Sequence, residues 1–248
     1  MNILVVNDDG IQSAGFRALV DALSEVASVY VCAPKTQQSA KSHSITLGKA
    51  IDVREVEYPG AVKAYEVDGT PADCTKIGLQ FMEEQGVNIH MVYSGINLGS
   101  NLGRDTLYSG TVGAASEAAL GGVYGVAVSA DSHSATHFGM AQKLAVEVID
   151  KIYGKLDTSV VISINVPDLP EEEIKGVRFA PLGNRFYDDR FHKNEEGKYE
   201  LSGQPSGLER HPGCCDVREV ADNYAVITPL QFDFTCNTTM KEIKEWEF

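Results

Sequence analysis

Short apolar runs alternate with amphipathic segments through the first two thirds of the chain. The run from Ile3 to Val6 is apolar and β-branched, which is typical of a strand buried on both faces of a parallel sheet. The segment from Gly15 to Val26 places its apolar side chains on one stripe and predicts a helix. The same patterns predict further strands at 29–32, 88–94, 123–130 and 160–164, and further helices at 70–84, 111–120 and 139–152. This alternation indicates parallel βαβ units and hence an α/β fold with a mostly parallel sheet.

Two parts of the chain depart from this alternation. Residues 45–67 alternate loosely around the turn at Pro59-Gly60 and predict an extended hairpin arm. After Pro170, polar clusters and short strand-like pieces replace the regular pattern, although 224–228 is apolar enough to return to the core. We therefore expect a core over 1–170 and, over 171–248, an extended C-terminal arm that contacts a partner chain.

Composition and charge narrow the classes of protein that fit. The chain has 248 residues, of which 43% are hydrophobic and 23% charged, as in ordinary globular proteins. Its net charge is −14, which argues against binding to a nucleic-acid polymer, because such binding needs a basic face. The N-terminus leads directly into a strand and no apolar run is long enough to span a membrane, so we expect neither a signal peptide nor a membrane anchor.

The cysteines bear on the compartment. There are five of them, an odd number, and none forms a CxxC pair. This usage fits reduced thiols better than a disulfide framework and predicts a cytoplasmic protein. The chain's cysteines are Cys32, Cys74, Cys214, Cys215 and Cys236.

Four polar stretches follow predicted strands or begin a predicted helix. They are 7–10 with Asp8 and Asp9, 39–44 with Ser39 and His43, 94–105 with Asn97 and Asp105, and Ser109-Gly110-Thr111. Because parallel strands present their carboxyl ends at one edge of a sheet, we expect these stretches to meet there. Their carboxylate, amide and hydroxyl oxygens suit Mg²⁺ or Mn²⁺ rather than zinc.

The neighbouring carboxylates of Asp8 and Asp9 admit two interpretations. They repel each other, at a cost in free energy, unless a cation or a proton compensates. The alternative is that one of them caps the next helix while the other is solvated.

The stretch from Ser109 to Thr111 begins a helix and could bind an anion. Backbone N–H groups at a helix N-terminus point toward a ligand, and the helix dipole favours negative charge there. The alternative is an ordinary N-cap, and the glycines between Gly95 and Gly103 have a similar alternative as a flexible loop. The sequence contains neither GxxxxGK[ST] nor a strand-linked GxGxxG, so a P-loop or a dinucleotide site is not supported.

Taken in order, these motifs resemble the SurE family, the stationary-phase survival protein E nucleotidases. The matching stretches are VNDDG from Val6, AP from Ala33, S-x-x-S-x-SIT from Ser39, VDGTPADC from Val67, SGINLGSNLGRDTLYSGTVGAA from Ser94 and NVP from Asn165. The resemblance implies a Rossmann-like three-layer catalytic core and a divalent-metal-dependent 5′-nucleotidase. Its substrates would be nucleoside monophosphates, and short polyphosphate is an additional candidate. It also implies a homodimer or homotetramer with exchanged C-terminal elements.

The resemblance also carries residue roles onto this sequence. The family's ligands to one Mg²⁺ or Mn²⁺ per subunit fall on Asp8, Asp9, Ser39 and Asn97, and its phosphate-binding residues on Asn97, Ser109, Gly110 and Thr111. The chain departs from the family pattern at Lys35-Thr36 and at Ala40, so the loop around Ser39 is expected to differ in shape.

Several roles stay open on sequence grounds. Asp8 or Asp9 is the candidate catalytic residue, either by orienting and deprotonating a water molecule or by attacking phosphorus directly to form an aspartyl-phosphate. His43 is a candidate acid for the leaving group, with a solvated loop histidine as the alternative. Asp105 either lies behind the metal ligands or pins the glycine-rich loop together with Arg104.

Two rival functions use the same residues. A metal- or nucleotide-binding sensor without turnover would need the same ligands. A glycosyltransferase or deacetylase with a similar Asp-Asp pair on an α/β core would yield products other than inorganic phosphate from nucleotides. Release of phosphate from a substrate panel distinguishes these classes.

Overall fold

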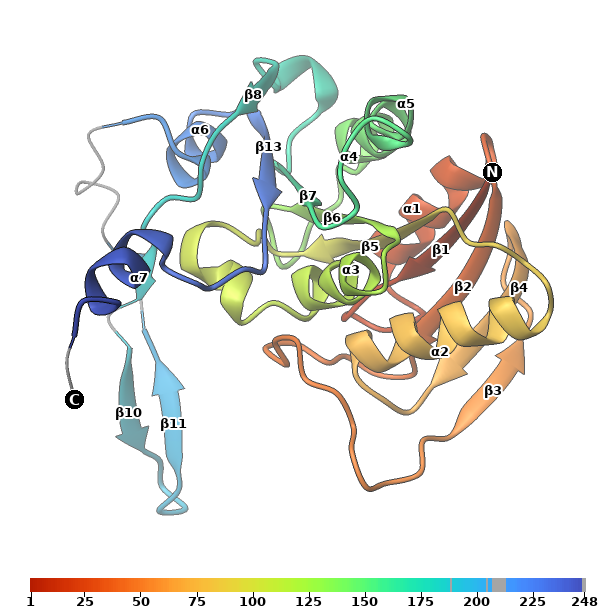
Figure 1. Ribbon diagram of the computed structural model, residues 1–248, viewed down its shortest axis with the longest axis horizontal. Helices are drawn as coiled ribbons and strands as arrows, with labels where there is room; N and C mark the ends of the chain where they lie inside the picture. Colours follow the sequence, from red (N-terminus) through yellow and green to blue (C-terminus); the bar gives the residue numbers. More distant parts are fainter. Residues whose placement is uncertain (188, 204, 207–212, 247–248) are drawn as a thin grey trace.

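The computed structural model describes residues 1–187, 189–203, 205–206 and 213–246. Within these residues, one nine-stranded sheet runs in the order β3-β4-β2-β1-β5-β6-β7-β13-β8 (Figure 1). Its mutually parallel strands are β1 (Asn2–Val6), β2 (Ser28–Pro34), β4 (Ala61–Val67), β5 (Met91–Leu98), β6 (Tyr124–Ala130) and β7 (Val161–Val166). The predicted α/β class with a mostly parallel sheet is confirmed.

Helices cover both faces of this sheet and make three layers (Figure 1). Successive side chains of a strand point to opposite faces, so Ile3 and Val5 lie in one core cluster and Leu4 and Val6 in the other. The first cluster lies under α1 and α4, and the second under α2 and α3. The helices of the core are α1 (Ala14–Ser24), α2 (Pro71–Glu84), α3 (Gly110–Leu120), α4 (Gly139–Glu147) and α5 (Ile149–Ile152).

The start of α2 shows how the sequence defines a helix end. The Thr70 hydroxyl accepts a hydrogen bond from the backbone N–H of Asp73, and the Asp73 carboxylate accepts one from the N–H of Thr70. This reciprocal capping box satisfies two backbone donors that the helix cannot pair internally. Pro71 occupies the first turn, where its missing N–H costs nothing. The predicted helix at 70–84 is confirmed.

The hairpin arm predicted over 45–67 exists but is not free. Its first strand, β3 (Val53–Val56), pairs antiparallel with β4, and β4 continues the main sheet by pairing parallel with β2. The reason lies in the pattern of β4, because Ala64, Tyr65 and Val67 are buried. The expectation of an extended arm is wrong for this segment.

The chain returns to the sheet near its end, where 224–228 was expected to do so. Strand β13 (Ala225–Leu230) pairs antiparallel with β7, and β8 (Val177–Phe179) pairs parallel with β13 at the sheet edge. Helix α6 (Asp216–Ala221) packs against β13. Short 3-10 helices, η1 (Gly103–Leu107) and η2 (Glu171–Glu173), lie in the connections. The division of the chain at residue 170 stays a prediction.

Two parts of the C-terminal third extend away from the sheet (Figure 1). The hairpin of β10 (Arg190–Lys193) and β11 (Tyr199–Ser202) is exposed along its whole length. Helix α7 (Asn237–Ile243) also lies outside the core layers (Figure 1). The remaining short strands, β9 (Phe186–Tyr187) and β12 (Pro205–Ser206), pair with each other.

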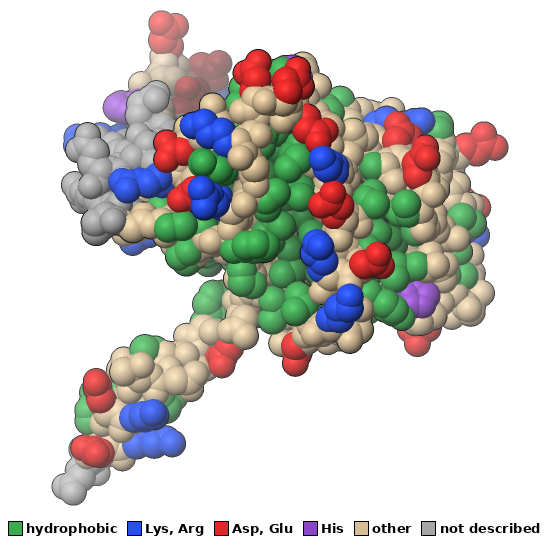
Figure 2. Space-filling model, turned by 90° about the horizontal axis from the view of Figure 1, so that it is seen from above, with side chains coloured by type: hydrophobic (Ala, Val, Ile, Leu, Met, Phe, Trp, Pro, Cys, Tyr) green, Lys and Arg blue, Asp and Glu red, His purple; other side chains and the backbone are tan. Residues whose placement is uncertain are grey.

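Figure 2 shows hydrophobic side chains gathered in the middle of one face, with acidic and basic side chains interspersed around them. A cavity of about 260 Å³ is lined by side chains from α4, α5, β7, β8 and β13, among them Leu144, Ile152 and Phe179. Among the described residues, no helix is both long enough and apolar enough to cross a membrane.

Candidate functional site

The sheet reverses its strand order between β1 and β5. From β1 the chain continues to β2 on one side, and from β5 it continues to β6 on the other. In open α/β sheets the crevice outside the carboxyl ends of the strands at such a reversal is where ligands bind. Asp8 and Asp9 follow β1 directly and Asn97 lies near the end of β5, so the structure brings these predicted residues to this point.

Asp8 is held by the first turn of α3. The side-chain hydroxyl of Thr111 donates a hydrogen bond to Oδ1 of Asp8 at 2.5 Å, and the backbone N–H of Thr111 donates to Oδ2 at 3.2 Å. A Cβ added to Gly110 would lie 2.9 Å from the Cβ of Asp8, so only glycine permits this approach. Asp8 is 4% exposed. The predicted phosphate-binding stretch and the predicted metal ligand are thus in direct contact.

Burial changes the acidity of both aspartates. It raises the pKa of Asp8 from 3.8 to about 6, opposed by the hydrogen bond from Thr111 and reinforced by the charge of Asp9. Burial also raises the pKa of Asp9, although hydrogen bonds from Leu98 and Gln37 lower it in part. The alternative of a solvated, helix-capping pair therefore does not describe Asp8, and the site favours a compensating cation or proton.

Asn97 and Ser39 complete the predicted donor set. The Nδ2 of Asn97 donates to the carbonyl of Gly99 at 2.7 Å, a bond that does not use the amide oxygen. The backbone N–H of Gln38 donates to the carbonyl of Asp8 at 2.6 Å, which brings the loop after β2 against the aspartates. Ser39 is the next residue in that loop and is exposed. The contact between Gln38 and Asp8 therefore places Ser39 at the same edge of the sheet.

The chemistry of these donors fits a hard divalent cation. Carboxylate, amide and hydroxyl oxygens are the ligands that Mg²⁺ and Mn²⁺ prefer. In the part of the chain that the structure describes, no three His, Cys, Asp or Glu side chains form a metal-binding group, so a zinc-type cluster is not present there. In the same part of the chain, the buried Oδ1 of Asn7 has no hydrogen-bond donor. This unpartnered oxygen directly precedes Asp8 in the chain and is of the amide type that such a cation accepts.

The sequence allowed two interpretations of the N-terminus of α3, an ordinary N-cap and an anion site, and the structure is compatible with both. The Ser109 hydroxyl accepts a hydrogen bond from the backbone N–H of Val112 at 3.0 Å, so Ser109 is an N-cap. Both donors of Thr111 serve Asp8 in this structure. Ser109 and the backbone at Gly110 therefore remain as the groups through which the helix dipole would favour an anion.

The glycine-rich loop is joined to neighbouring elements by hydrogen bonds and an ion pair. Asn101 donates from its backbone to Asn165 Oδ1 at 2.8 Å and from its side chain to Ser129 Oγ at 2.8 Å. Asp105 pairs with Arg185, with Nη1 and Oδ2 3.5 Å apart, so the partner lies in the C-terminal third. This ion pair favours a role for Asp105 in holding the glycine-rich loop in place.

One supporting residue was missed by sequence reasoning. Asp216 is fully buried and accepts hydrogen bonds from the backbone N–H groups of Gly103, Gly183 and Val217 at 2.7, 2.5 and 2.7 Å. It joins the glycine-rich loop to the start of α6. An aspartate at the start of a short helix is common, and the local sequence does not indicate that Asp216 contacts Gly103, 113 positions away.

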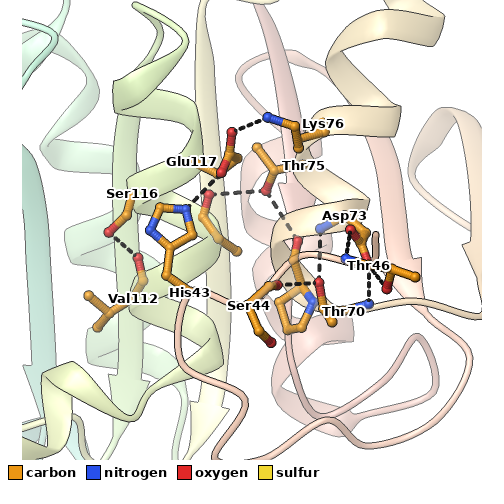
Figure 3. Close-up of polar contacts among 12 residues, drawn as sticks. His43, Ser44, Thr46, Thr70, Asp73, Thr75, Lys76, Val112, Ser116 and Glu117 are labelled. Atoms are coloured by element: carbon orange, nitrogen blue, oxygen red, sulfur yellow. Dashed lines mark hydrogen bonds and ion pairs between the residues drawn. The ribbon is translucent and has the colours of Figure 1, made fainter. Parts of the chain in front are cut away.

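His43 lies against α3, in the loop that carries Ser39. Its Nε2 is 2.7 Å from Oε2 of Glu117, and Nζ of Lys76 is 2.7 Å from Oε1 of the same carboxylate (Figure 3). His43 and Ser109 both line a cavity of about 430 Å³ along one side of α3. Sequence reasoning assigned no role to Glu117 or Lys76, because their contact depends on how α2 and α3 pack together.

Known proteins resemble this chain over nearly its full length. A family described as Survival protein SurE matches residues 3–189. A protein of Clostridium botulinum named 5′-nucleotidase SurE is 38% identical over 250 residues, which cover 99% of this chain and 98% of that protein. One of the same name from Clostridium beijerinckii is 40% identical over 95% of this chain and 94% of its own length. A crystal structure of the SurE protein from Aquifex aeolicus superposes with a TM-score of 0.84 at 34% identity, covering 98% of both chains.

Proposed function

The chain belongs to the SurE family and is a 5′-nucleotidase, and we propose that it hydrolyses nucleoside monophosphates to nucleoside and phosphate with one Mg²⁺ or Mn²⁺ per subunit. The observation that supports this most directly is the position of Asp8. A buried carboxylate, next to a second one, lies in contact with the first turn of a helix at the reversal of the sheet. Such a site favours a doubly charged ion beside an anionic group.

We assign the metal site to Asp8, Asp9, Ser39 and Asn97. The cation would polarise the phosphoryl group and offset its charge. Thr111 keeps Asp8 fixed through both of its donors, so that Asp8 anchors the site. Asp9 accepts the Leu98 N–H at 2.8 Å with one oxygen and has only a 3.5 Å contact with Gln37 on the other. Asp9 is therefore the carboxylate that we expect to orient the attacking water and take its proton.

The phosphoryl group is assigned to Asn97 and the start of α3. Ser109, Gly110 and Thr111 form the first turn of this helix, whose positive dipole end faces Asp8. In the transition state, charge spreads over the equatorial oxygens of phosphorus, and preorganised donors stabilise it there. The terminal phosphoryl group of short polyphosphate offers the same oxygens, so we propose it as a second substrate.

We further expect a homodimer or homotetramer. The β10–β11 hairpin exposes Phe191, Tyr199 and Leu201, which are 68%, 66% and 55% exposed, and Phe234 before α7 is 85% exposed. Apolar side chains on elements that lie outside the core layers support contact with another copy of the chain (Figure 1). The five cysteines are all unpaired, which supports the expectation of a cytoplasmic protein.

A substrate panel tests this function. The purified protein is incubated with Mn²⁺ or Mg²⁺ and a series of nucleoside monophosphates, tripolyphosphate and p-nitrophenyl phosphate, and released phosphate is measured. We expect release from the nucleotides with either ion, loss of release in EDTA, and loss in the Asp8→Asn variant. Nucleotide binding without release of phosphate under any divalent ion would instead identify a sensor.

A further inference from the structure

Three elements meet at the carboxylate of Glu117. His43 comes from the loop after β2, Lys76 from α2 and Glu117 from α3 (Figure 3). Both oxygens of Glu117 are engaged, Oε2 by Nε2 of His43 and Oε1 by Nζ of Lys76, each at 2.7 Å. The Glu117 side chain is only 12% exposed. We call this arrangement the Glu117 clamp.

Glu117 is charged in this position. Burial by itself would raise its pKa, but hydrogen bonds from Lys76 and His43 outweigh that effect and lower the pKa below its ordinary value. A carboxylate that accepts a hydrogen bond from one nitrogen of an imidazole fixes the orientation of the ring. Lys76 offsets the carboxylate from the other side and limits how far Glu117 can move.

The loop that carries His43 is held on both sides of the histidine, on one side by the residue before the N-cap of α3 and on the other by the N-cap of α2. The N–H of Ser42 donates to the carbonyl of Tyr108 at 2.9 Å, and the carbonyl of Ser44 accepts from the Thr70 hydroxyl at 2.7 Å. A Cβ added to Gly113 would lie 2.6 Å from the carbonyl oxygen of Ser42. These contacts hold the loop backbone without help from Glu117. The Glu117 clamp therefore acts on the imidazole ring of His43 rather than on the backbone.

The clamp leaves the second ring nitrogen of His43 for another partner. With Nε2 donating to Glu117, Nδ1 is turned away from the carboxylate (Figure 3). The His43 side chain is 32% exposed and lines the same cavity, of about 430 Å³, as Ser109 at the N-terminus of α3. A ligand that fills this cavity beside the phosphate site can therefore meet the imidazole.

We propose that Glu117, backed by Lys76, is a positioning residue that orients His43 to protonate the leaving oxygen of the nucleotide. The proposal rests on the nucleotidase function above. As water adds its oxygen to phosphorus, the bond from phosphorus to the ribose oxygen breaks and leaves its electron pair on that oxygen. The ribose oxygen takes the Nδ1 proton of His43, while Asp9 takes the proton of the water. Solvent then restores the proton to His43 and removes the one from Asp9, so that the cycle is balanced.

Comparison of two substrates tests this role. A nucleoside leaves as an alkoxide and needs a proton, whereas p-nitrophenolate leaves readily without one. We expect His43→Gln to lower kcat on a nucleoside monophosphate by about 100-fold, and Glu117→Gln by about 10-fold, while p-nitrophenyl phosphate hydrolysis changes by less than about threefold. The ratio of the two rates comes from one preparation, so a reduced folded fraction does not affect it. Glu83→Gln, which removes an exposed carboxylate from α2, is the matched control and leaves both rates unchanged.

A double variant tests whether Glu117 acts on turnover through His43. If Glu117 acts only through His43, His43→Gln combined with Glu117→Gln has the same nucleotide kcat as His43→Gln alone. Equal losses on both substrates, or additive losses in the double variant, would show that the clamp only supports the loop and would overturn the inference. A wild-type protein that releases phosphate from neither substrate would instead contradict the nucleotidase function itself.

Discussion

Thr111 and Asp8 are 103 positions apart in the chain, yet the Thr111 hydroxyl donates a 2.5 Å hydrogen bond to the Asp8 carboxylate. The contact joins the end of the first strand to the first turn of α3. It couples the residue assigned to the cation with the helix assigned to the phosphoryl group, so a change at either one is expected to affect both.

Removal of the Thr111 hydroxyl tests that coupling. Thr111→Val keeps the shape of the side chain but leaves the Asp8 carboxylate without a donor whose bond is worth about 1.5–3 kcal/mol. We expect the pKa of Asp8 to rise further and kcat/KM to fall by about 10-fold or more. Thr111→Ser retains the hydroxyl and should keep most of the activity. Comparable activity in the two variants would contradict the role of this bond.

The stability of the metal-free protein should depend on pH through Asp8. Its folded-state pKa of about 6 lies above the ordinary 3.8, so the folded state holds the proton more tightly. The resulting stability is fully present below pH 3.8 and is lost as pH rises through 6. A shift of this size corresponds to roughly 3 kcal/mol.

Asp8→Asn isolates this contribution. In EDTA, urea unfolding should show the variant to be more stable than the wild type at pH 7, with the difference shrinking toward pH 4.5. Groups distant from this pair titrate alike in both proteins and cancel in the comparison, whereas the variant also removes the repulsion between Asp8 and Asp9. A variant that is less stable at pH 7 would show that the hydrogen bonds from Thr111 outweigh the cost of the buried charge.

Gly113 controls the position of the loop that carries Ser39 and His43. In Gly113→Ala, the new Cβ would lie 2.6 Å from the Ser42 carbonyl oxygen, so the loop has to move away from α3. We expect kcat/KM to fall by about 10-fold while far-UV circular dichroism stays unchanged. Gly139→Ala, whose Cβ would meet only an atom 4.0 Å away, serves as the control. Full activity in Gly113→Ala would mean that the loop position does not matter for turnover.

Asp216 supports the glycine-rich loop from the C-terminal third. Asp216→Asn replaces a carboxylate that accepts three backbone hydrogen bonds with an amide whose NH₂ group faces donors. We expect a loss of about 2–3 kcal/mol in the free energy of unfolding, measured by urea denaturation. Asp222→Asn, at an exposed position after α6, should change stability little. Equal stability of the two variants would contradict the supporting role of Asp216.

The sequence predicts the elements of the core well, because their signals are local. The strand at Ile3 to Val6 and the helix beginning after Thr70 follow from apolar pattern and capping. The prediction of an extended arm over 45–67 was wrong, because a hairpin pattern does not reveal that β4 joins the main sheet beside β2. The helix predicted over 139–152 is divided into α4 and α5, and nothing in the local sequence explains the division.

The meeting of the candidate residues at one edge of the sheet was predictable from the sequence, but their contacts were not. Asp8, Asp9 and Asn97 come together because strand ends in a parallel sheet share one edge. Three supporting hydrogen bonds each join residues more than 70 positions apart, namely those of Thr111 with Asp8, Asp216 with Gly103 and Glu117 with His43. Such contacts depend on how helices pack on the sheet, which residue patterns do not encode locally.

A crystal grown or soaked with Mn²⁺ tests the central claim most directly, through the anomalous signal of the ion. We predict one strong peak per subunit between the carboxylates of Asp8 and Asp9, within bonding distance of Asn97 and Ser39. An ion bound elsewhere, or no peak at this edge of the sheet, would contradict the account.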